Sequence, residues 1–458
     1  MTLHYLTLTE ASALLHKGEL SPVELTRACL ERIQQLDGRL HCFITPTSIT
    51  ALQQARQAEA DIGKGKTGVL RGIPLALKDL FETAGVRTTA GSKIFSTHVP
   101  EKDCAAMEKL SSAGAVMLGK LNMHEIALGV TNENPHYGDC LNPWDENHIS
   151  GGSSGGAAAA LAAGLCYGAL GTDTGGSIRI PASLCGVVGL KPTRGRVSLR
   201  GVIPLSWSLD HVGPMARCVR DVAILYKAIA GYDPSDPFSV KIPVKDILAH
   251  LGEGVQGWRV VLAHDSYFYD VDPDVLAAVQ QAGKVFEELG AKVSEISPPG
   301  ASEAAQINAM ITQSEAAAFH RERLDTQPDD FGEDVRKRLE TGAAFTSFET
   351  ILARSAQPVL RRQYERFFEN YDILLTPTTP IPAPLRGGDA VARARKLTRF
   401  TAPFNLTGLP ALSLPCGFSK DGLPIGLQII SRPWAEDLVL RAAQAYEQAT
   451  GWHSRRAM

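Results

Sequence analysis

The sequence lacks closely spaced cysteines, and this limits the kinds of protein that it can encode. Its eight cysteines are scattered over 458 residues and form no Cys-x-x-Cys pair. Such spacing argues against a disulfide framework and against a zinc site built from thiolates. The twelve histidines include no His-Glu-x-x-His motif. We therefore predict reduced cysteines, no metal, no cofactor and a cytoplasmic location.

Long apolar runs and an excess of one charge are also missing. The longest apolar stretch, residues 157–171, is short and interrupted by glycines, so it does not predict a membrane span. The N-terminal segment shows no basic region followed by an apolar region, and we expect no secretory signal. Lysine and arginine total 46 against 49 acidic residues, a formal net charge of −3. Nothing therefore indicates direct binding of nucleic acid or of an anionic membrane.

Helical and strand patterns alternate along the chain, which predicts an α/β protein. Residues 73–78 and 167–174 have the pattern of buried strands, and residues 48–65 have that of a helix. A hairpin is expected over 410–431, around the turn Lys420-Asp421-Gly422. We interpret the chain as a single domain, 1–458, with N-terminal helices to about 66, a core over about 67–235 and a remainder over about 236–458.

The first chemical feature is the turn Gly-Gly-Ser-Ser-Gly-Gly at 151–156. It matches the G-x-S-x-G pattern of α/β-hydrolases, which requires a strand before the serine and a histidine elsewhere in the chain. Here a polar loop precedes the turn, and no histidine stands in an informative context. A hydrolase site at Ser153 or Ser154 with a histidine base remains an alternative. A phosphate-binding loop is disfavoured because alanines follow the glycines where Gly-Lys-Ser/Thr is required.

The second feature is the turn Thr-Gly-Gly-Ser at 174–177. Its glycines permit a concave row of backbone N–H groups, which suits stabilisation of an oxyanion while Ser177 attacks a carbonyl carbon. A serine nucleophile needs a base, and Lys78 ends an apolar strand where burial would keep its amine neutral. Spacing alone favours the other interpretation, in which Lys78 extends into solvent at the end of the strand.

Together these stretches resemble the amidase signature family of serine hydrolases. The matching segments cover nearly the whole chain: 72–93, 119–138, 142–164, 170–198, 206–217, 374–380 and 422–430. The resemblance implies a single α/β fold with a central mixed β-sheet flanked by helices on both faces.

The resemblance also implies a Ser-Ser-Lys triad that hydrolyses C–N bonds through an acyl-enzyme. Ser177 would be the nucleophile, Ser153 would relay its proton and Lys78 would be the base. Ser154 would support the site without reacting. The oxyanion would be bound by the turn that contains Thr174, Gly175 and Gly176, and Asp173 and Arg179 would hold that turn in place.

Details of the resemblance favour a stand-alone amidase. His124 stands where aspartate is expected, Arg194 replaces a tyrosine, and Ser206–His211 resembles stand-alone enzymes. The arginine that would read the carboxylate of glutamine falls near Gln357. We therefore predict a monomer or homodimer that hydrolyses a small-molecule amide, or a carbamate, urea or ester. The alternative is the glutaminase subunit of a tRNA-dependent amidotransferase complex.

Overall fold

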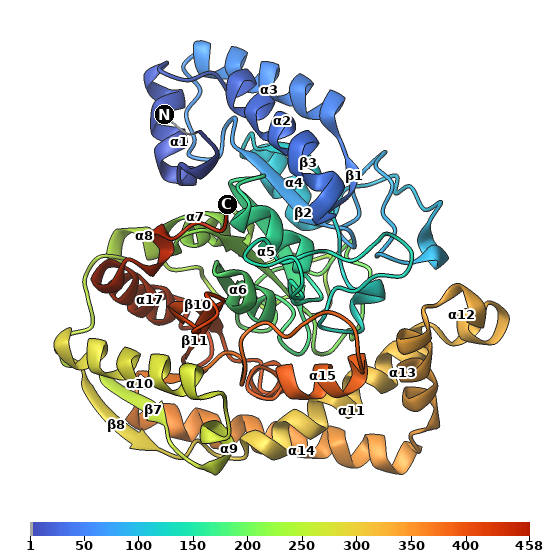
Figure 1. The fold of residues 1–458 in the computed structure, drawn as a ribbon, viewed down its shortest axis with the longest axis vertical. Helices are drawn as coiled ribbons and strands as arrows, with labels where there is room; N and C mark the ends of the chain where they lie inside the picture. Colours follow the sequence, from blue (N-terminus) through green and yellow to red (C-terminus); the bar gives the residue numbers. More distant parts are fainter. Residues whose placement is uncertain (1–2) are drawn as a thin grey trace.

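The computed structural model describes residues 3–458 and contains an 11-stranded β-sheet (Figure 1). The strand order is β1-β3-β2-β4-β6-β5-β10-β11-β9-β7-β8. The strands are β1 (Phe43–Pro46), β2 (Pro74–Lys78), β3 (Val116–Leu121), β4 (Gly168–Asp173), β5 (Val188–Lys191), β6 (His211–Ala216), β7 (Arg259–Ala263), β8 (Lys292–Ile296), β9 (Ile373–Pro377), β10 (Ala411–Phe418) and β11 (Pro424–Ile430).

The sheet is mixed and is flanked by helices, which confirms the predicted fold class. β2 is parallel to both of its neighbours, β3 and β4, whereas β4 pairs with β6 in antiparallel fashion. The α-helices are α1 (Leu8–Lys17), α2 (Pro22–Leu40), α3 (Ser48–Gly63), α4 (Ala105–Ser112), α5 (Gly155–Ala162), α6 (Arg179–Cys185), α7 (Val219–Ile229), α8 (Ile247–His250), α9 (Ser266–Tyr269), α10 (Pro273–Glu288), α11 (Ala301–Phe319), α12 (Arg321–Thr326), α13 (Glu333–Ala344), α14 (Ser347–Asn370), α15 (Ala390–Leu397), α16 (Ala402–Leu406) and α17 (Glu436–Thr450).

Two groups of helices pack on the central strands. α5 and α6 contact each other and lie on β4 and β5, respectively. α7, α10 and α17 form the other group, in which α17 contacts both α7 and α10. The sheet takes strands from all three parts of the chain that the sequence distinguishes.

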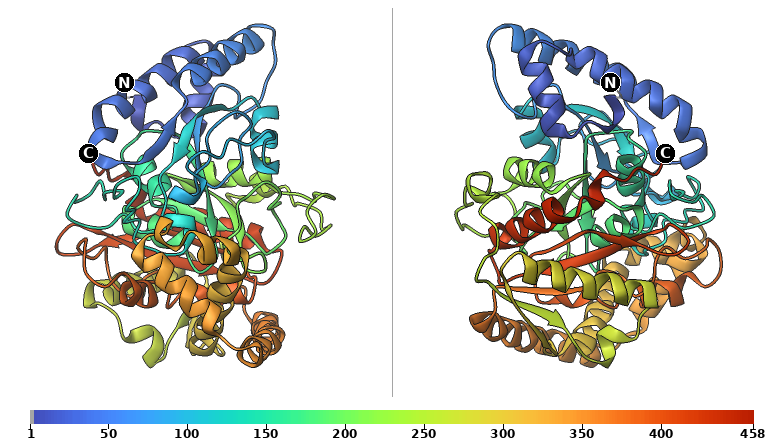
Figure 2. Two further views of the ribbon diagram at one scale, coloured as in Figure 1. Left: turned by 90° about the vertical axis from the view of Figure 1, so that its right-hand side faces the viewer. Right: turned by 60° about the vertical axis from the view of Figure 1, so that its left-hand side comes forward.

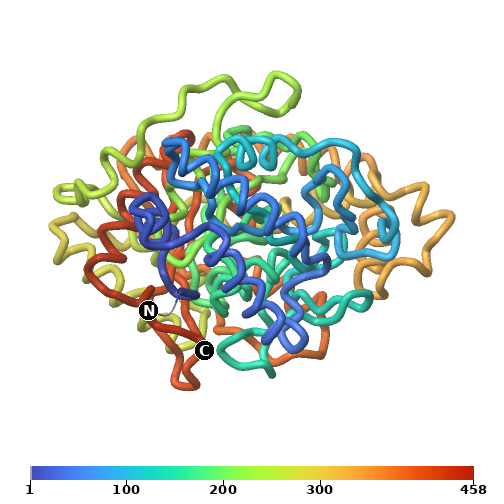
Figure 3. Tube along the Cα trace, turned by 90° about the horizontal axis from the view of Figure 1, so that it is seen from above, coloured from blue at the N-terminus to red at the C-terminus, as the bar shows by residue number. Residues whose placement is uncertain are grey.

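The N-terminal helices cover the β1 end of the sheet, and Figure 3 shows them crossing the top of the molecule in blue. Ser21 caps α2 by accepting the backbone N–H groups of Val23 and Glu24, while the Glu24 side chain accepts the N–H of Ser21. This capping box, with Pro22 at the first helical position, fixes where α2 begins. The two ends of the chain lie close together, since the Tyr5 hydroxyl donates to the backbone oxygen of Met458 at 2.6 Å.

The hairpin of β10 and β11 was predicted, whereas β5 and β6 were not. Glycine and proline at Gly213 and Pro214 hide the strand pattern of β6. Gly213 is required there because a Cβ atom would lie 2.0 Å from the carbonyl oxygen of Leu190 on β5. Close backbone approach thus explains the glycine that obscured the strand.

Helices α11 to α14 form a layer at the opposite end of the molecule from the N-terminal helices (orange in Figure 2). α11 is central to this layer, because it contacts α13, α14 and α16. α11 also reaches the turn that contains Ser177, through Asn308. All eight cysteines are free and buried. None of the helices over residues 3–458 is long and apolar enough to cross a membrane.

Candidate active site

Lys78 ends β2 and points into the protein rather than into solvent. Its side chain is fully buried, and Nζ donates to Ser153 Oγ at 2.7 Å and to Thr172 Oγ1 at 2.8 Å. Burial lowers the pKa of Lys78 to about 7, although the carboxylates of Asp210 and Asp173 oppose this shift. A large fraction of the amine is therefore neutral near pH 7, as a general base requires.

Ser153 lies in the glycine turn before α5 and follows a cis peptide bond with Gly152. Its carbonyl oxygen accepts the backbone N–H of His124 at 3.1 Å. Glycine is needed at Gly156 because a Cβ atom would lie 2.4 Å from the backbone oxygen of Asn122. The glycines of this turn thus allow its backbone to pack closely against the neighbouring backbone.

The structure does not supply the histidine that a Ser-His hydrolase site at this turn would need. Within residues 3–458, no histidine side chain hydrogen-bonds to Ser153, Ser154 or Ser177. His211 is buried close by, but its Nδ1 lies against the backbone oxygens of Asp173 and Leu209. The contacts therefore favour Lys78 over a histidine as the base.

Ser177 lies between β4 and α6, and the two glycine turns meet as expected. The Ser154 N–H donates to the Ser177 carbonyl oxygen at 3.1 Å, and Ser154 Oγ donates to the Thr172 carbonyl oxygen at 3.2 Å. Ser154 therefore ties the two turns together. Over the described part of the chain, no hydrogen bond joins the hydroxyls of Ser153 and Ser177.

The amide groups of the second turn differ from the expected arrangement. The Gly176 N–H donates to Asp173 Oδ1 at 2.8 Å and is therefore already paired. The N–H groups of Gly175 and Ser177 have no acceptor among residues 3–458. Glycine is nevertheless required at Gly176. Its φ is +136°, and a Cβ atom there would lie 2.2 Å from Thr401 Oγ1.

Asp173 and Arg179 hold the turn from inside, as the resemblance implied. Both side chains are fully buried, and Arg179 Nη2 lies 2.9 Å from Asp173 Oδ1. Burial alone would raise the pKa of Asp173, but the Arg179 guanidinium holds it below its usual value. Arg179 also donates to Gln428 Oε1 and to Asn405 Oδ1, each at 2.6 Å. The pair is thus fully hydrogen-bonded, which a buried ion pair requires.

Three residues at the site were not predicted from the sequence: Thr172, Asp210 and Asn308. Thr172 accepts from Lys78, and Asp210 Oδ1 accepts the Thr174 hydroxyl at 2.6 Å. Asn308 Nδ2 donates to the Thr174 carbonyl oxygen at 3.1 Å. Thr172 could have been found from its place on the strand before Ser177. No sequence pattern marks Asn308, because its contact with the turn depends on how α11 packs in the folded chain.

Position 357 does not carry the expected arginine, but an arginine lies one turn earlier on α14. Gln357 Nε2 donates to the backbone oxygen of Leu406 at 2.9 Å. Arg354 Nη1 donates to Ser208 Oγ at 2.8 Å, and its guanidinium pairs with Glu315. A guanidinium therefore reaches the 206–208 segment even though position 357 is glutamine.

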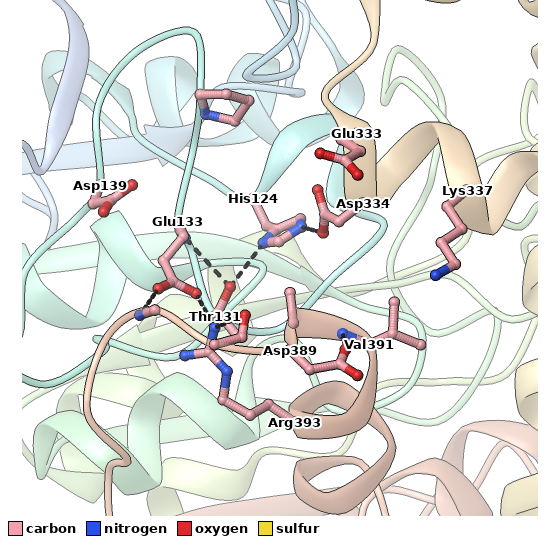
Figure 4. Close-up of a pocket in the computed structure, with 14 residues that line it drawn as sticks. His124, Thr131, Glu133, Asp139, Glu333, Asp334, Lys337, Asp389, Val391 and Arg393 are labelled. Atoms are coloured by element: carbon pink, nitrogen blue, oxygen red, sulfur yellow. Dashed lines mark hydrogen bonds and ion pairs between the residues drawn. The ribbon is translucent and has the colours of Figure 1, made fainter.

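Two cavities lie beside the helices α11 to α15. The one in Figure 4 has a volume of about 430 Å³ and lies between the loop that follows His124, the start of α13 and the start of α15. Glu133 pairs with Arg393 at 2.7 Å there, and His124 Nε2 lies 3.2 Å from Asp334 Oδ2. The second, of about 590 Å³, is lined by Phe95, Phe319 and Arg323 among others. Neither lining includes a residue of the proposed triad.

Comparison with known protein families shows the family to which the chain belongs. The family profile described as Amidase matches residues 24–440 of the chain. The chain belongs to the amidase family. It is accordingly an enzyme of the type that hydrolyses C–N bonds.

Individual relatives indicate the kind of amidase that this chain resembles. The A subunit of glutamyl-tRNA(Gln) amidotransferase from Moorella thermoacetica is 42% identical, over 100% of this chain and 99% of the relative. The solved structure of the subunit of the same name from Thermotoga maritima is 36% identical, with a TM-score of 0.83, over 97% of this chain and 95% of that one. A chain from a vestigial protein complex that reveals the evolutionary origins of an s-triazine catabolic enzyme is 36% identical, with a TM-score of 0.93, over 97% and 99% of the two chains.

These relatives correct the predicted subclass. The prediction that this amidase is closer to stand-alone enzymes, and hydrolyses small amides or carbamates by itself, is wrong, because the full-length relatives are named as amidotransferase subunits. The predicted partners, a small molecule only with a monomer or homodimer, are corrected by the same names. The error arose from giving a few local departures, at His124, Arg194 and Gln357, more weight than identity along the whole chain.

Proposed function

We propose that this protein is the amide-hydrolysing subunit of a tRNA-dependent amidotransferase, in which it releases ammonia from glutamine. The observation that carries the proposal is the identity of about 40% over the whole chain to proteins named as the A subunit of glutamyl-tRNA(Gln) amidotransferase. The partners are then the other subunits of the complex and, through them, an aminoacylated tRNA.

In the proposed reaction Ser177 Oγ attacks the side-chain carboxamide carbon of glutamine. The Ser177 proton passes to Ser153 Oγ as the Ser153 proton passes to the neutral amine of Lys78. The proton returns along the same path to the leaving nitrogen, so the C–N bond breaks, ammonia departs and a glutamyl ester remains on Ser177. Water then attacks that ester and releases glutamate. The 2.7 Å contact between Lys78 and Ser153 supports this path.

The negative oxygen of each tetrahedral intermediate would be stabilised by the unpaired N–H groups of Gly175 and Ser177. Backbone donors that are fixed before the reaction are effective because they need no reorientation as charge develops. The bonds of Asp173, Asp210 and Asn308 to this turn support that assignment, since they limit its movement.

The test uses the complex isolated with this chain, in wild-type form and with Ser177→Ala. Transfer of an amide group to glutamyl-tRNA(Gln) is measured with glutamine or with ammonium chloride as the nitrogen source. We expect the wild type to use both and Ser177→Ala to use ammonium alone. Cleavage of aryl amides without any hydrolysis of glutamine, by the chain alone and in the complex, would overturn the proposal.

A further inference from the structure

Asn308 reaches the reactive turn from a helix that is distant in sequence. It lies on α11, two turns before Glu315, so the two side chains share one face of the helix. The side chain is 3% exposed, and Nδ2 donates to the carbonyl oxygen of Thr174 at 3.1 Å. Among residues 3–458 the Asn308 side chain makes no other hydrogen bond, so its Oδ1 accepts from no donor.

This one hydrogen bond determines the direction of a second group. The carbonyl of Thr174 and the N–H of Gly175 belong to the same planar trans peptide, so they point in opposite directions. By holding the Thr174 oxygen, Asn308 therefore turns the Gly175 N–H away from α11. That N–H has no hydrogen-bond acceptor among residues 3–458. Asn308 also packs closely on Gly175, because a Cβ atom there would be 3.2 Å from its Oδ1.

The rest of the turn is held by other bonds, which isolates the contribution of Asn308. The Thr174 hydroxyl donates to Asp210 at 2.6 Å, and the Gly176 N–H donates to Asp173 at 2.8 Å. Neither bond constrains the peptide between Thr174 and Gly175 directly. Asn308 is the side chain that does so, and it does so as a neutral group.

We propose that Asn308 is a positioning residue that aims the Gly175 N–H at the oxyanion formed on Ser177. The inference rests on the proposed function for the role of Ser177. Neutrality is part of the role, because a carboxylate at this position would repel both the Thr174 oxygen and the developing oxyanion. A donor that is misdirected rather than removed loses only part of its effect on the transition state.

The experiment compares Asn308→Ala and Asn308→Asp with the wild type in the complex. We expect Asn308→Ala to lower kcat about tenfold and to leave KM within about threefold, since a bond to the transition state is weakened. Asn308→Asp should lose more activity near pH 8. Its rate relative to the wild type should recover as the pH falls towards 5, because a protonated carboxyl again donates to Thr174 and carries no charge. Gln306→Ala, an exposed amide on the same helix, should match the wild type.

A second readout separates this role from folding and from the identity of the substrate. Ser177 is labelled with an organophosphonate. The phosphoryl oxygen of this reagent occupies the oxyanion position, and the labelling reaction uses no glutamine or other amide substrate. Labelling rates should fall in the same order as kcat, while the thermal midpoints of the variants show that they are folded. Equal labelling rates in the wild type and both Asn308 variants would refute the role of Asn308 alone. Rapid labelling of a wild type that leaves glutamine intact would refute the proposed function alone.

Discussion

Lys78 Nζ lies 2.7 Å from Ser153 Oγ, although the two residues are 75 positions apart in the sequence. The contact arises because β2 is parallel to β3 and β4 and lies between them, so its last residue is enclosed on both sides. The glycine turn before α5 then brings a hydroxyl to the amine. Burial of that amine lowers its pKa to about 7, which the proposed role of Lys78 as the base requires.

The hydrolysis rate should rise with pH through about 7 and then level off. The amine of Lys78 has a pKa of about 7 in the folded protein, and only its neutral form accepts a proton. The limb of kcat/KM for glutamine between about pH 5 and 9 reports this group in the free enzyme. A profile that is flat, or that falls over this range, would contradict the assignment of Lys78 as the base.

Replacement of Lys78 with methionine should abolish hydrolysis and also change how stability depends on pH. The unfolded lysine keeps its proton up to about 10.5, whereas the folded one releases it at about 7. Between these pH values the unfolded chain binds more protons, so the free energy of unfolding of the wild type rises with pH. Urea titrations of both proteins at several pH values should show a smaller rise in Lys78→Met. The same rise in both would mean that the folded lysine stays protonated.

The two serines should differ in their reaction with an organophosphonate. Ser177→Ala should take up no label at the site, because the nucleophile is absent. Ser153→Ala should retain the site but react at least about a hundredfold more slowly, since the path for the proton is interrupted. Ser154→Ala is the matched control and should react much faster than Ser153→Ala. Peptide mapping by mass spectrometry locates the label, and a label on Ser153 instead of Ser177 would reverse the proposed roles.

Replacement of Arg179 with methionine should strongly destabilise the fold. It leaves the fully buried carboxylate of Asp173 without its ionic partner, which typically costs about 3–5 kcal/mol. The free energy of unfolding from urea titration measures the loss. Arg361→Met, on the exposed face of α14, should change it by less than about 0.5 kcal/mol. Similar values for the two variants would show that Asp173 is adequately held by Asn405 and the backbone.

Much of the fold and part of the site could be predicted from local patterns. The alternation of strands and helices, the cap at Ser21 and the hairpin of β10 and β11 each depend on neighbouring residues, and the structure contains all of them. The glycine turns around Ser153 and Ser177, with a lysine ending an apolar strand, were visible for the same reason. The subclass of amidase was predicted wrongly, because it is expressed over the whole chain and not at a few motif positions.

Only the tertiary structure decided which way Lys78 points and which amides remain unpaired. The sequence allowed Lys78 to reach solvent, and the neighbouring strands and turns prevent it. The sequence grouped Gly176 with the oxyanion donors, and Asp173 takes its N–H. Asp210 and Asn308 reach Thr174 across 36 and 134 positions, respectively. Contacts over such separations follow no periodicity, since they are fixed by how helices and loops pack against the sheet.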